Sequence, residues 1–235
     1  MVHADVTSAN TVGYQLIDVC QNFSLFTVTF KNISTETYDL LDIIPCDASG
    51  NPFTGGTSMG KILVQKMDDT GKYLGAYNYL SVMGKWANGM APLTPGAVTL
   101  KAGESICINN GQGAAIKFRV SGEVSLTPQT YTLPPNFSLV GNMTPVAVDL
   151  LDVQLCDASG NPFTGGTSMG KVLVQKMDAD GKYLGAYNYL SVMGKWANGM
   201  APLTPGAVML QPGESFCVNN GQGAPVILKF PNPIK

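Results

Sequence analysis

Apolar and polar residues alternate in short runs along most of the chain, which is the pattern of β-strands that bury one face. The run FSLFTVTFKNI (residues 23–33) alternates in this way and is rich in β-branched and aromatic residues. The run AVTLKAGESICINN (97–110) indicates a strand, a turn at Ala-Gly and a second strand. No segment keeps a helical apolar period over three turns, so the pattern predicts no long amphipathic helix.

Turn residues divide these runs at short intervals. In MDDTGKY (67–73) and MDADGKY (177–183), acidic or hydroxyl residues and a glycine separate two strand-like runs, as in a β-hairpin. We expect roughly seven to nine short strands in each half of the chain, with turn signals about every 8–12 residues. This spacing indicates a sandwich or a barrel.

The same pattern occurs twice. Residues 46–114 and 156–224 align without a gap and differ at only eight of 69 positions. Upstream, Asn22-Phe-Ser-Leu25 matches Asn136-Phe-Ser-Leu139, and the first copy carries four extra residues around KNISTET. Because the fold of a duplicated segment is itself duplicated, the predicted fold class is all-β, with two tandem, near-identical β-sandwich or barrel modules.

The repeat also predicts the domain organisation. Residues 1–9 form an N-terminal arm or a signal-peptide scar, residues 10–124 form β module 1, and residues 125–235 form β module 2. The junction is SGEVSLTPQT (121–130), in which Pro128 limits flexibility.

A glycine-rich segment, GGTSMGK, occurs at 55–61 and again at 165–171 and resembles a phosphate-binding P-loop. That motif requires a Ser or Thr after the lysine and a helix that begins there. Ile62 and Val172 follow the two lysines, and both open strand-like runs. The segment therefore indicates a loop that enters a strand, and no nucleotide cofactor is expected.

Charge is scarce and balanced. Charged residues make up 13% of the chain, with 14 basic and 16 acidic side chains, and Arg119 is the only arginine. A nucleic-acid-binding protein normally carries a basic, arginine-rich surface, so that class is excluded. Near-zero net charge also does little to keep copies apart, which favours a homo-oligomer or polymer. No apolar run is long enough to predict a membrane span.

The N-terminus has one feature of an exported protein. Val2-His3-Ala4 has the small-residue spacing of a signal-peptidase site, with Asp5 as the first residue of the mature chain. The alternative is an ordinary N-terminal arm. The expected location is extracellular or at the cell surface.

Catalytic and metal-binding patterns are weak, so we expect no enzyme, no catalytic residues and no metal site. The single histidine, His3, lies in the N-terminal arm and can form no nucleophile–base pair with the rest of the chain. A calcium-loop-like Asp178-Ala-Asp180-Gly181 lacks the distal glutamate and is better explained by a hairpin. A hydrolase would need recurring carboxylates to meet in a cleft, namely Asp42, Asp47 and Glu104 with Asp152, Asp157 and Glu214.

Aromatic residues are concentrated in GKYLGAYNYLSVMGKWANGM, which occurs identically at 71–90 and 181–200. Rings with a polar tip suit a protein interface or a sugar platform, whereas the alternative is that they fill the core, which we favour for Trp86. In a regular strand the three tyrosines of each copy would share one face. The candidate interface or glycan platform comprises Tyr73, Tyr77, Tyr79, Trp86, Tyr183, Tyr187, Tyr189 and Trp196.

Five cysteines follow the repeat. Cys46 corresponds to Cys156 and Cys107 to Cys217, while Cys20 has no counterpart. In an exported protein, Cys46–Cys107 and Cys156–Cys217 are candidate disulfides, and Cys20 is a candidate intermolecular thiol. The alternative is that the cysteines are small buried apolar residues.

Three segments together resemble a known group of proteins. They are Ser8-Ala-Asn-Thr-Val-Gly-Tyr14, Asn136-Phe-Ser-Leu-Val-Gly-Asn142, and Pro212-Gly-Glu-Ser-Phe216 with Val218 beyond it. This arrangement resembles uncharacterised secreted bacterial β-repeat proteins of Verrucomicrobia and Lentisphaerae, with modules of the form NTVGY…GFNLVGN…GQGFWV. The chain departs from them at Cys107 and Cys217, where an aromatic residue often stands. The resemblance implies export and a β module, and implies no catalytic residues.

Two functional hypotheses follow. The first is a secreted, non-enzymatic structural protein whose duplicated β modules self-assemble into an extracellular filament, surface layer or matrix, because duplicated surfaces allow one contact to repeat between chains. The alternative is a tandem carbohydrate-binding or adhesin module, in which the repeated Tyr/Trp segments bind glycan with avidity.

Overall fold

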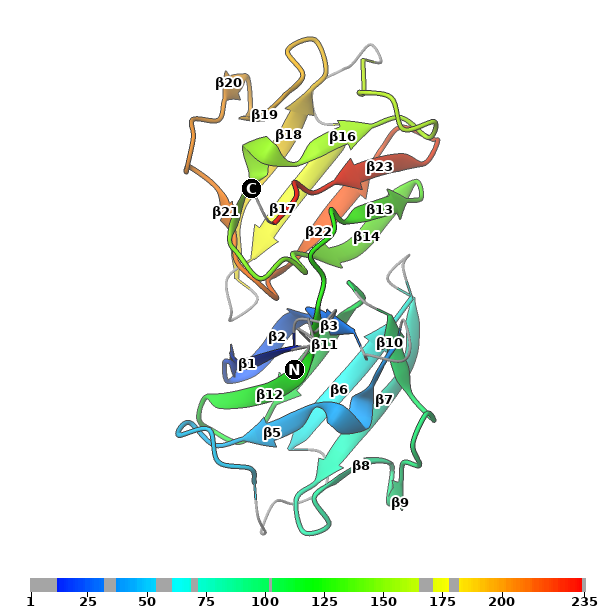
Figure 1. Cartoon of the computed structure of the whole chain (residues 1–235), viewed down its shortest axis with the longest axis vertical. Helices are drawn as coiled ribbons and strands as arrows, with labels where there is room; N and C mark the ends of the chain where they lie inside the picture. The colour runs from blue at the N-terminus through cyan, green and yellow to red at the C-terminus, as the bar shows by residue number, and fades with distance from the viewer. Residues whose placement is uncertain are drawn as a thin grey trace, which may run out of the picture.

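The protein is described by a computed structural model that covers residues 12–31, 37–53, 61–68, 72–101, 103–164, 171–177 and 182–233 (Figure 1). The predicted all-β class is confirmed. Within these residues the only helical segments are two 3-10 turns, η1 (Leu40–Asp42) and η2 (Leu150–Asp152). His3, the proposed cleavage site and the glycine-rich residues 55–60 and 165–170 lie outside the described residues.

The first half of the chain forms two layers of sheet. The larger sheet has the strand order β2-β11-β6-β7-β8-β9, and the facing layer contains β1-β12-β3, with β5 also paired to β12, and the two-stranded β10-β4. The strands are β1 (Val12–Val19), β2 (Asn22–Thr27), β3 (Phe30–Lys31), β4 (Thr37–Asp39), β5 (Ile44–Cys46), β6 (Ile62–Met67), β7 (Tyr73–Leu80), β8 (Lys85–Asn88), β9 (Ala91–Pro92), β10 (Thr99–Lys101), β11 (Ser105–Asn110) and β12 (Ile116–Val124).

The second half repeats this arrangement. Its larger sheet has the order β14-β22-β17-β18-β19-β20, and the facing layer contains β13-β23-β16 and β15-β21. The strands are β13 (Thr130–Leu133), β14 (Asn136–Gly141), β15 (Val148–Asp149), β16 (Gln154–Cys156), β17 (Val172–Met177), β18 (Tyr183–Leu190), β19 (Lys195–Asn198), β20 (Ala201–Pro202), β21 (Met209–Leu210), β22 (Ser215–Asn220) and β23 (Val226–Lys229). Below, module 1 denotes residues 12–124 and module 2 residues 125–233.

The two halves agree in register as well as in order. Leu63 pairs with Asn78 in module 1 and Leu173 with Asn188 in module 2, and both hairpins carry a bulge after the corresponding lysine. The hairpins predicted at 67–73 and 177–183 are therefore present, although their turn residues lie outside the described part. The domain boundary near residue 125 remains a prediction, and the sheets fall on either side of it.

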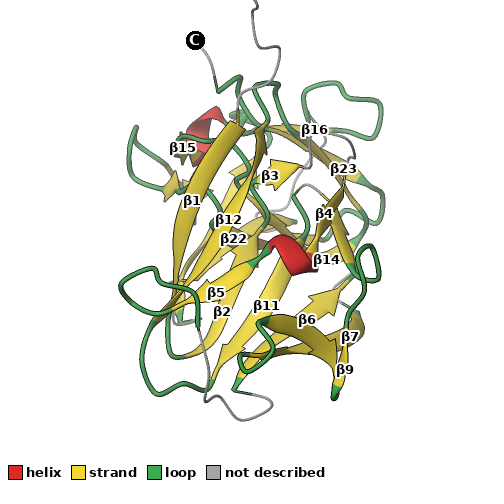
Figure 2. Ribbon diagram, turned by 60° about the horizontal axis from the view of Figure 1, so that its bottom comes forward, coloured by secondary structure: helices red, strands yellow, loops and turns green. Residues whose placement is uncertain are grey.

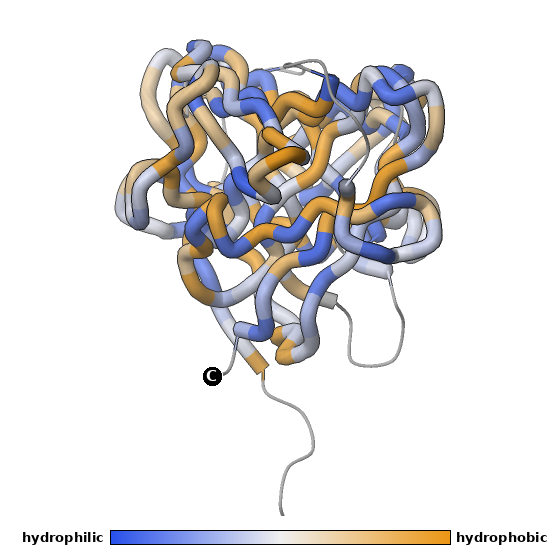
Figure 3. The backbone as a smooth tube through the Cα atoms, turned by 90° about the horizontal axis from the view of Figure 1, so that it is seen from above, coloured by the Kyte–Doolittle hydropathy of each residue, from blue (hydrophilic) through white to orange (hydrophobic). Residues whose placement is uncertain are grey.

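The buried hydrophobic residues form one core in each module. Strands and the loops between them make up nearly all of the described chain (Figure 2). Hydrophobic and hydrophilic positions alternate along much of the chain (Figure 3), as expected of strands that bury one face. The largest buried side chain in each core is a tryptophan, Trp86 or Trp196. Its indole Nε1–H donates a hydrogen bond of 2.8 Å to a backbone carbonyl beyond the 3-10 turn, on Ile43 or Val153.

The two cores differ in which strand of one cross-strand pair carries a phenylalanine. Phe26 on β2 faces Ile106 on β11 in module 1, whereas Val140 on β14 faces Phe216 on β22 in module 2. All four side chains are buried. Each core thus receives one phenylalanine from this cross-strand pair, and the pairs differ in size by only one methylene group, a change close to the volume-conserving exchanges that cores tolerate best.

The candidate disulfides Cys46–Cys107 and Cys156–Cys217 are wrong: none of the five cysteines is in a disulfide. Cys107 alternates along β11 with Ile106 and Ile108, whose side chains fill the core, so its own side chain projects from the opposite face of the sheet. Cys46 belongs to β5 in the facing layer. Cys20 is half-buried after β1, and its role between chains remains a prediction.

No helix in the described residues is long and apolar enough to cross a membrane.

The exchanged ring yields a test of core packing. Substituting Ile106→Phe in module 1 adds a second ring beside Phe26 and should lower the free energy of unfolding by about 1–3 kcal/mol through overpacking. Adding Phe26→Val recreates the pair found in module 2 and should recover most of that loss. Urea unfolding followed by tryptophan fluorescence measures both changes. A double variant no more stable than the single one would contradict this account.

The cysteines give a second test. Without reductant, unfolded protein should react with iodoacetamide at all five cysteines, as counted by intact mass. In the folded protein the reaction should be slow at Cys107 and Cys217, because burial raises the pKa of both thiols and hides them from the reagent. If the unfolded protein carried fewer than five adducts, it would contain a disulfide that this structure lacks.

Candidate functional site

The most distinctive surface of each module is its outer tip, which we define as residues 81–93 in module 1 and 191–203 in module 2. Strands β8 and β9 lie at the end of module 1 farthest from module 2, and β19 and β20 lie at the opposite end of the molecule (Figure 1). Residues 71–98 and 181–208 are identical in sequence. The molecule therefore presents the same surface at both ends.

The first part of the tip is the turn between β7 and β8. Its backbone closes through hydrogen bonds from Met83 N–H to Leu80 O (3.0 Å) and from Gly84 N–H to Ser81 O (3.2 Å). Gly84 has a φ of 61°, a conformation that favours glycine. Leu80 and Ser81, just before the exposed part of the turn, are buried, whereas Val82 is 76% and Met83 51% exposed.

The second part is the turn between β8 and β9. Asn88 pairs with Ala91, which leaves Gly89 (φ 62°) and Met90 as the loop. The buried Asn78 side chain donates a hydrogen bond to Gly89 O from the neighbouring strand and holds the turn in place. Met90 is 70% exposed. Met90 is therefore a third exposed apolar side chain of this tip, on a turn whose backbone groups are hydrogen-bonded.

Trp86 anchors both turns, because it lies on β8 between them. Its ring is buried and meets Tyr79 edge-on at a centroid distance of 5.3 Å. The second tip repeats the backbone bonds of the first turn and the ring contact, with Val192, Met193 and Met200 exposed by 88%, 55% and 69%. The counterpart of Asn78 differs, because Asn188 Nδ2 is buried without a hydrogen-bond partner among the described residues. Within residues 80–93, the only charged side chain is Lys85. Each tip is thus a rigid, mostly apolar surface with one cation.

The predicted aromatic platform does not form. Trp86, Trp196, Tyr79 and Tyr189 are buried, Tyr77 and Tyr187 are half-buried against the cores, and only Tyr73 and Tyr183 are exposed, each by 56%. The expectation that the tyrosines share a face is wrong because of the bulge between Lys66 and Met67, where the register shifts. An extra residue in one strand reverses the face of those beyond it, which separates Tyr73 from Tyr77.

The recurring carboxylates lie on three separate elements. Asp42 ends η1, and burial, followed by the nearby Asp39 charge, raises its pKa. Asp47 occupies an exposed turn, where its carboxylate accepts hydrogen bonds from the backbone N–H groups of Ser49 and Asn51. No group of three or more metal-ligating side chains occurs among the described residues. The calcium-like residues 178–180 lie outside them.

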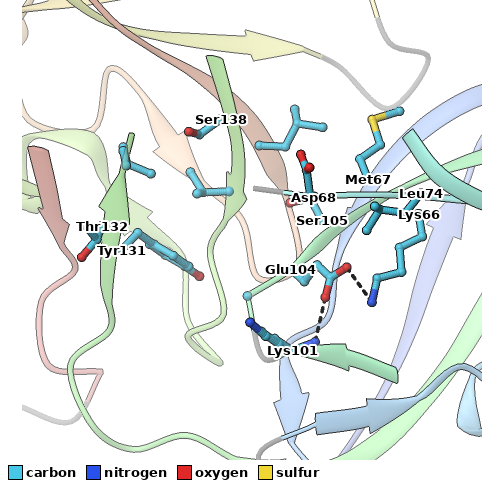
Figure 4. Close-up of a pocket in the computed structure, with 14 residues that line it drawn as sticks. Lys66, Met67, Asp68, Leu74, Lys101, Glu104, Ser105, Tyr131, Thr132 and Ser138 are labelled. Atoms are coloured by element: carbon cyan, nitrogen blue, oxygen red, sulfur yellow. Dashed lines mark hydrogen bonds and ion pairs between the residues drawn. The ribbon is translucent and has the colours of Figure 1, made fainter. Parts of the chain in front are cut away.

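Glu104 borders a cavity of about 340 Å³ between the modules, which the sequence analysis missed (Figure 4). Its carboxylate lies 3.2 Å from Lys66 Nζ and accepts a hydrogen bond from Lys101 N–H (2.9 Å). On the module 2 side, Tyr131 donates a hydrogen bond to Gly141 O (2.8 Å), and burial raises its pKa. No sequence motif marks this cavity, because its walls come from strands of both modules.

Most of the charged and polar groups around the cavity already have partners in the protein, whereas Ser138 Oγ is buried without one in the described part of the chain. Lys66 Nζ also donates to Thr99 O, and Ser105 Oγ lies 2.8 Å from Thr27 Oγ1. Charges that are already paired contribute little to recognition of a further ligand. The cavity is therefore a weaker candidate for the functional site than the tips.

A pH test follows from the turn at Asp47 and its copy at Asp157. Hydrogen bonds from the Asn51 and Asn161 backbone are the largest cause that holds the pKa of these carboxyls below 3.8. A depressed native pKa stabilises the fold above the unfolded value, and this stabilisation is lost as the pH falls through the native value. The Tm difference between wild type and Asp47→Ala/Asp157→Ala should be present at about pH 6 and shrink towards about pH 2.5.

The matched control is Asp18→Ala, since Asp18 is also exposed and its carboxylate lies 3.5 Å from the ammonium of Lys117 on a neighbouring strand. Its Tm should differ little from wild type at either pH. An equal Tm loss at both pH values in the turn variant would contradict the role of the carboxylate charge.

Comparison with protein-family models, with curated proteins and with solved structures finds no match to this chain.

Proposed function

We propose that the protein is a non-enzymatic, extracellular structural protein that assembles with copies of itself through its two tips, forming a filament, a surface layer or a matrix. The observation that carries this proposal is the duplication of one exposed apolar surface at opposite ends of a single chain. Export follows from the sequence expectation for the N-terminal arm.

The chemistry of the tip favours contact with another apolar surface. Val82, Met83 and Met90 are each more than half exposed, and their counterparts in module 2 are as well. Removing apolar surface from water is worth roughly 25 cal/mol per Å². The turns are already ordered by backbone hydrogen bonds and by Trp86, so little further ordering is required on contact.

The number of tips determines what such contacts build. A surface that binds a copy of itself makes a two-fold contact, which by itself closes into a dimer. This chain carries two such surfaces, so every molecule that has bound through one tip still presents the other. The product is an open chain of molecules.

The carbohydrate-binding alternative has less support. Of the eight aromatic residues proposed as a platform, two are exposed, Tyr73 and Tyr183, and they belong to different modules. A lone tyrosine offers a small surface for a sugar ring compared with a group of rings. Glycan binding is nevertheless a readout that the test below separates from assembly.

The proposal predicts a graded response to loss of the tips. Wild-type protein should form particles that grow with concentration. Val82→Asp/Met83→Ser disables one tip and should stop growth at dimers, because each molecule retains one binding surface. Adding Val192→Asp/Met193→Ser should leave monomers. Sedimentation velocity across a concentration series measures the sizes, and negative-stain electron microscopy shows their form.

The matched control is Phe23→Ser/Phe137→Ser, which removes two equally duplicated apolar side chains that are each 50% exposed but lie on β2 and β14, away from the tips. This variant should assemble as wild type does. Monomeric wild-type protein at every concentration, or a control that loses assembly while the tip variants keep it, would sink the proposal. Saturable glycan binding by such a monomer would support the alternative.

A further inference from the structure

The contact between the modules joins equivalent parts of the two copies. It lies at the ends of β2 and β11 in module 1 and of β14 and β22 in module 2, with an isolated bridge between Phe26 and Glu214. By the sequence alignment, Thr27 at the end of β2 corresponds to Gly141 at the end of β14, and Ser105 corresponds to Ser215. The modules therefore meet about an approximate two-fold axis.

Thr27 occupies the centre of this contact. It is fully buried, and its Oγ1 lies 2.8 Å from Ser105 Oγ and 2.6 Å from Ser215 Oγ. Its backbone N–H donates to Gly213 O of the other module (3.1 Å). A single threonine is thus within hydrogen-bond distance of two equivalent serines, one in each module.

Gly141 supplies the space that this threonine requires. A Cβ on Gly141 would lie 1.8 Å from Thr27 Oγ1 and 2.4 Å from Thr27 Cβ, far inside contact distance. Gly141 pairs within a regular ladder and has no positive φ, so space is the reason for a glycine here. The same Cβ would lie 2.8 Å from Glu214 O. The equivalent carbonyl in module 1 is Glu104 O, which accepts a hydrogen bond from Val28 N–H, so a threonine precedes that bond in module 1.

We propose that the Thr27–Gly141 pair makes the module contact heterotypic, so that the contact face of each module fits the opposite module and rejects a copy of itself. Two modules of the first kind would bring two threonines into one space. Two modules of the second kind would leave a gap and two serine hydroxyls without their shared partner. The partner that this face selects is a module 2 for module 1, whether from the same chain or from another. This inference does not rest on the role of the tips.

The test exchanges the two residues in the full chain. Gly141→Thr should lower the hydrogen-exchange protection of the amide of residue 27 by at least about tenfold, because this amide crosses the contact and overpacking opens it. Thr27→Gly should lower it as well, by a smaller factor. Thr27→Gly/Gly141→Thr should restore protection to within about threefold of wild type, since the new threonine meets the same two serines.

The matched control is Thr27→Val/Gly141→Thr, which keeps a branched side chain at both positions. In this variant the protection of the residue 27 amide should stay as low as in Gly141→Thr. If Gly141→Thr fails to fold, recovery of folded protein on adding Thr27→Gly is the expected result. The inference is overturned if the exchanged variant is as unprotected as Gly141→Thr, or if the valine control is rescued equally well. It is also overturned if Gly141→Thr leaves the protection unchanged.

Discussion

The buried tryptophan of each module is the constraint on which the rest of the structure depends. Trp86 lies on β8, next to the edge strand of the larger sheet, and its indole N–H donates a hydrogen bond to the carbonyl of Ile43, which precedes β5 of the facing layer. This one side chain therefore fills the core, joins the two layers and fixes the strand between the two exposed turns. The apolar turns can remain in solvent without collapsing onto the module because the residue beside them is held from within.

Much of the fold could be predicted from the sequence, because strand periodicity is a local property. Alternation predicted the strands, and the near-identity of the copies predicted that sheets and registers repeat. The faces of individual side chains were harder. The bulge after Lys66 and the outward direction of Cys107 depend on how neighbouring strands pair, which no single strand records. The contact between the modules could not be predicted from the sequence for the same reason, since Thr27 and Gly141 come together only when the modules pack against each other.

The differences between the copies separate positions that are buried in the core or at the module contact from the exposed turns of the tips. Phe26 and Thr27 differ from their counterparts Val140 and Gly141, and these residues lie in the core or against the other module. The turns that carry Val82 and Met90 are unchanged in the second copy. The buried positions, which meet a neighbour within the chain, are thus complementary between the copies, whereas the exposed turns of the tips are identical.

Two identical ends also remove polarity from the molecule. A filament in which growth at one end differs from growth at the other requires subunits with a distinct head and tail, and this chain offers the same apolar turns at both. Subunits would add in either orientation, and both ends would elongate at the same rate. Any directional cue, such as an anchoring point or a growth terminator, would have to come from the parts in which the modules differ or from another molecule.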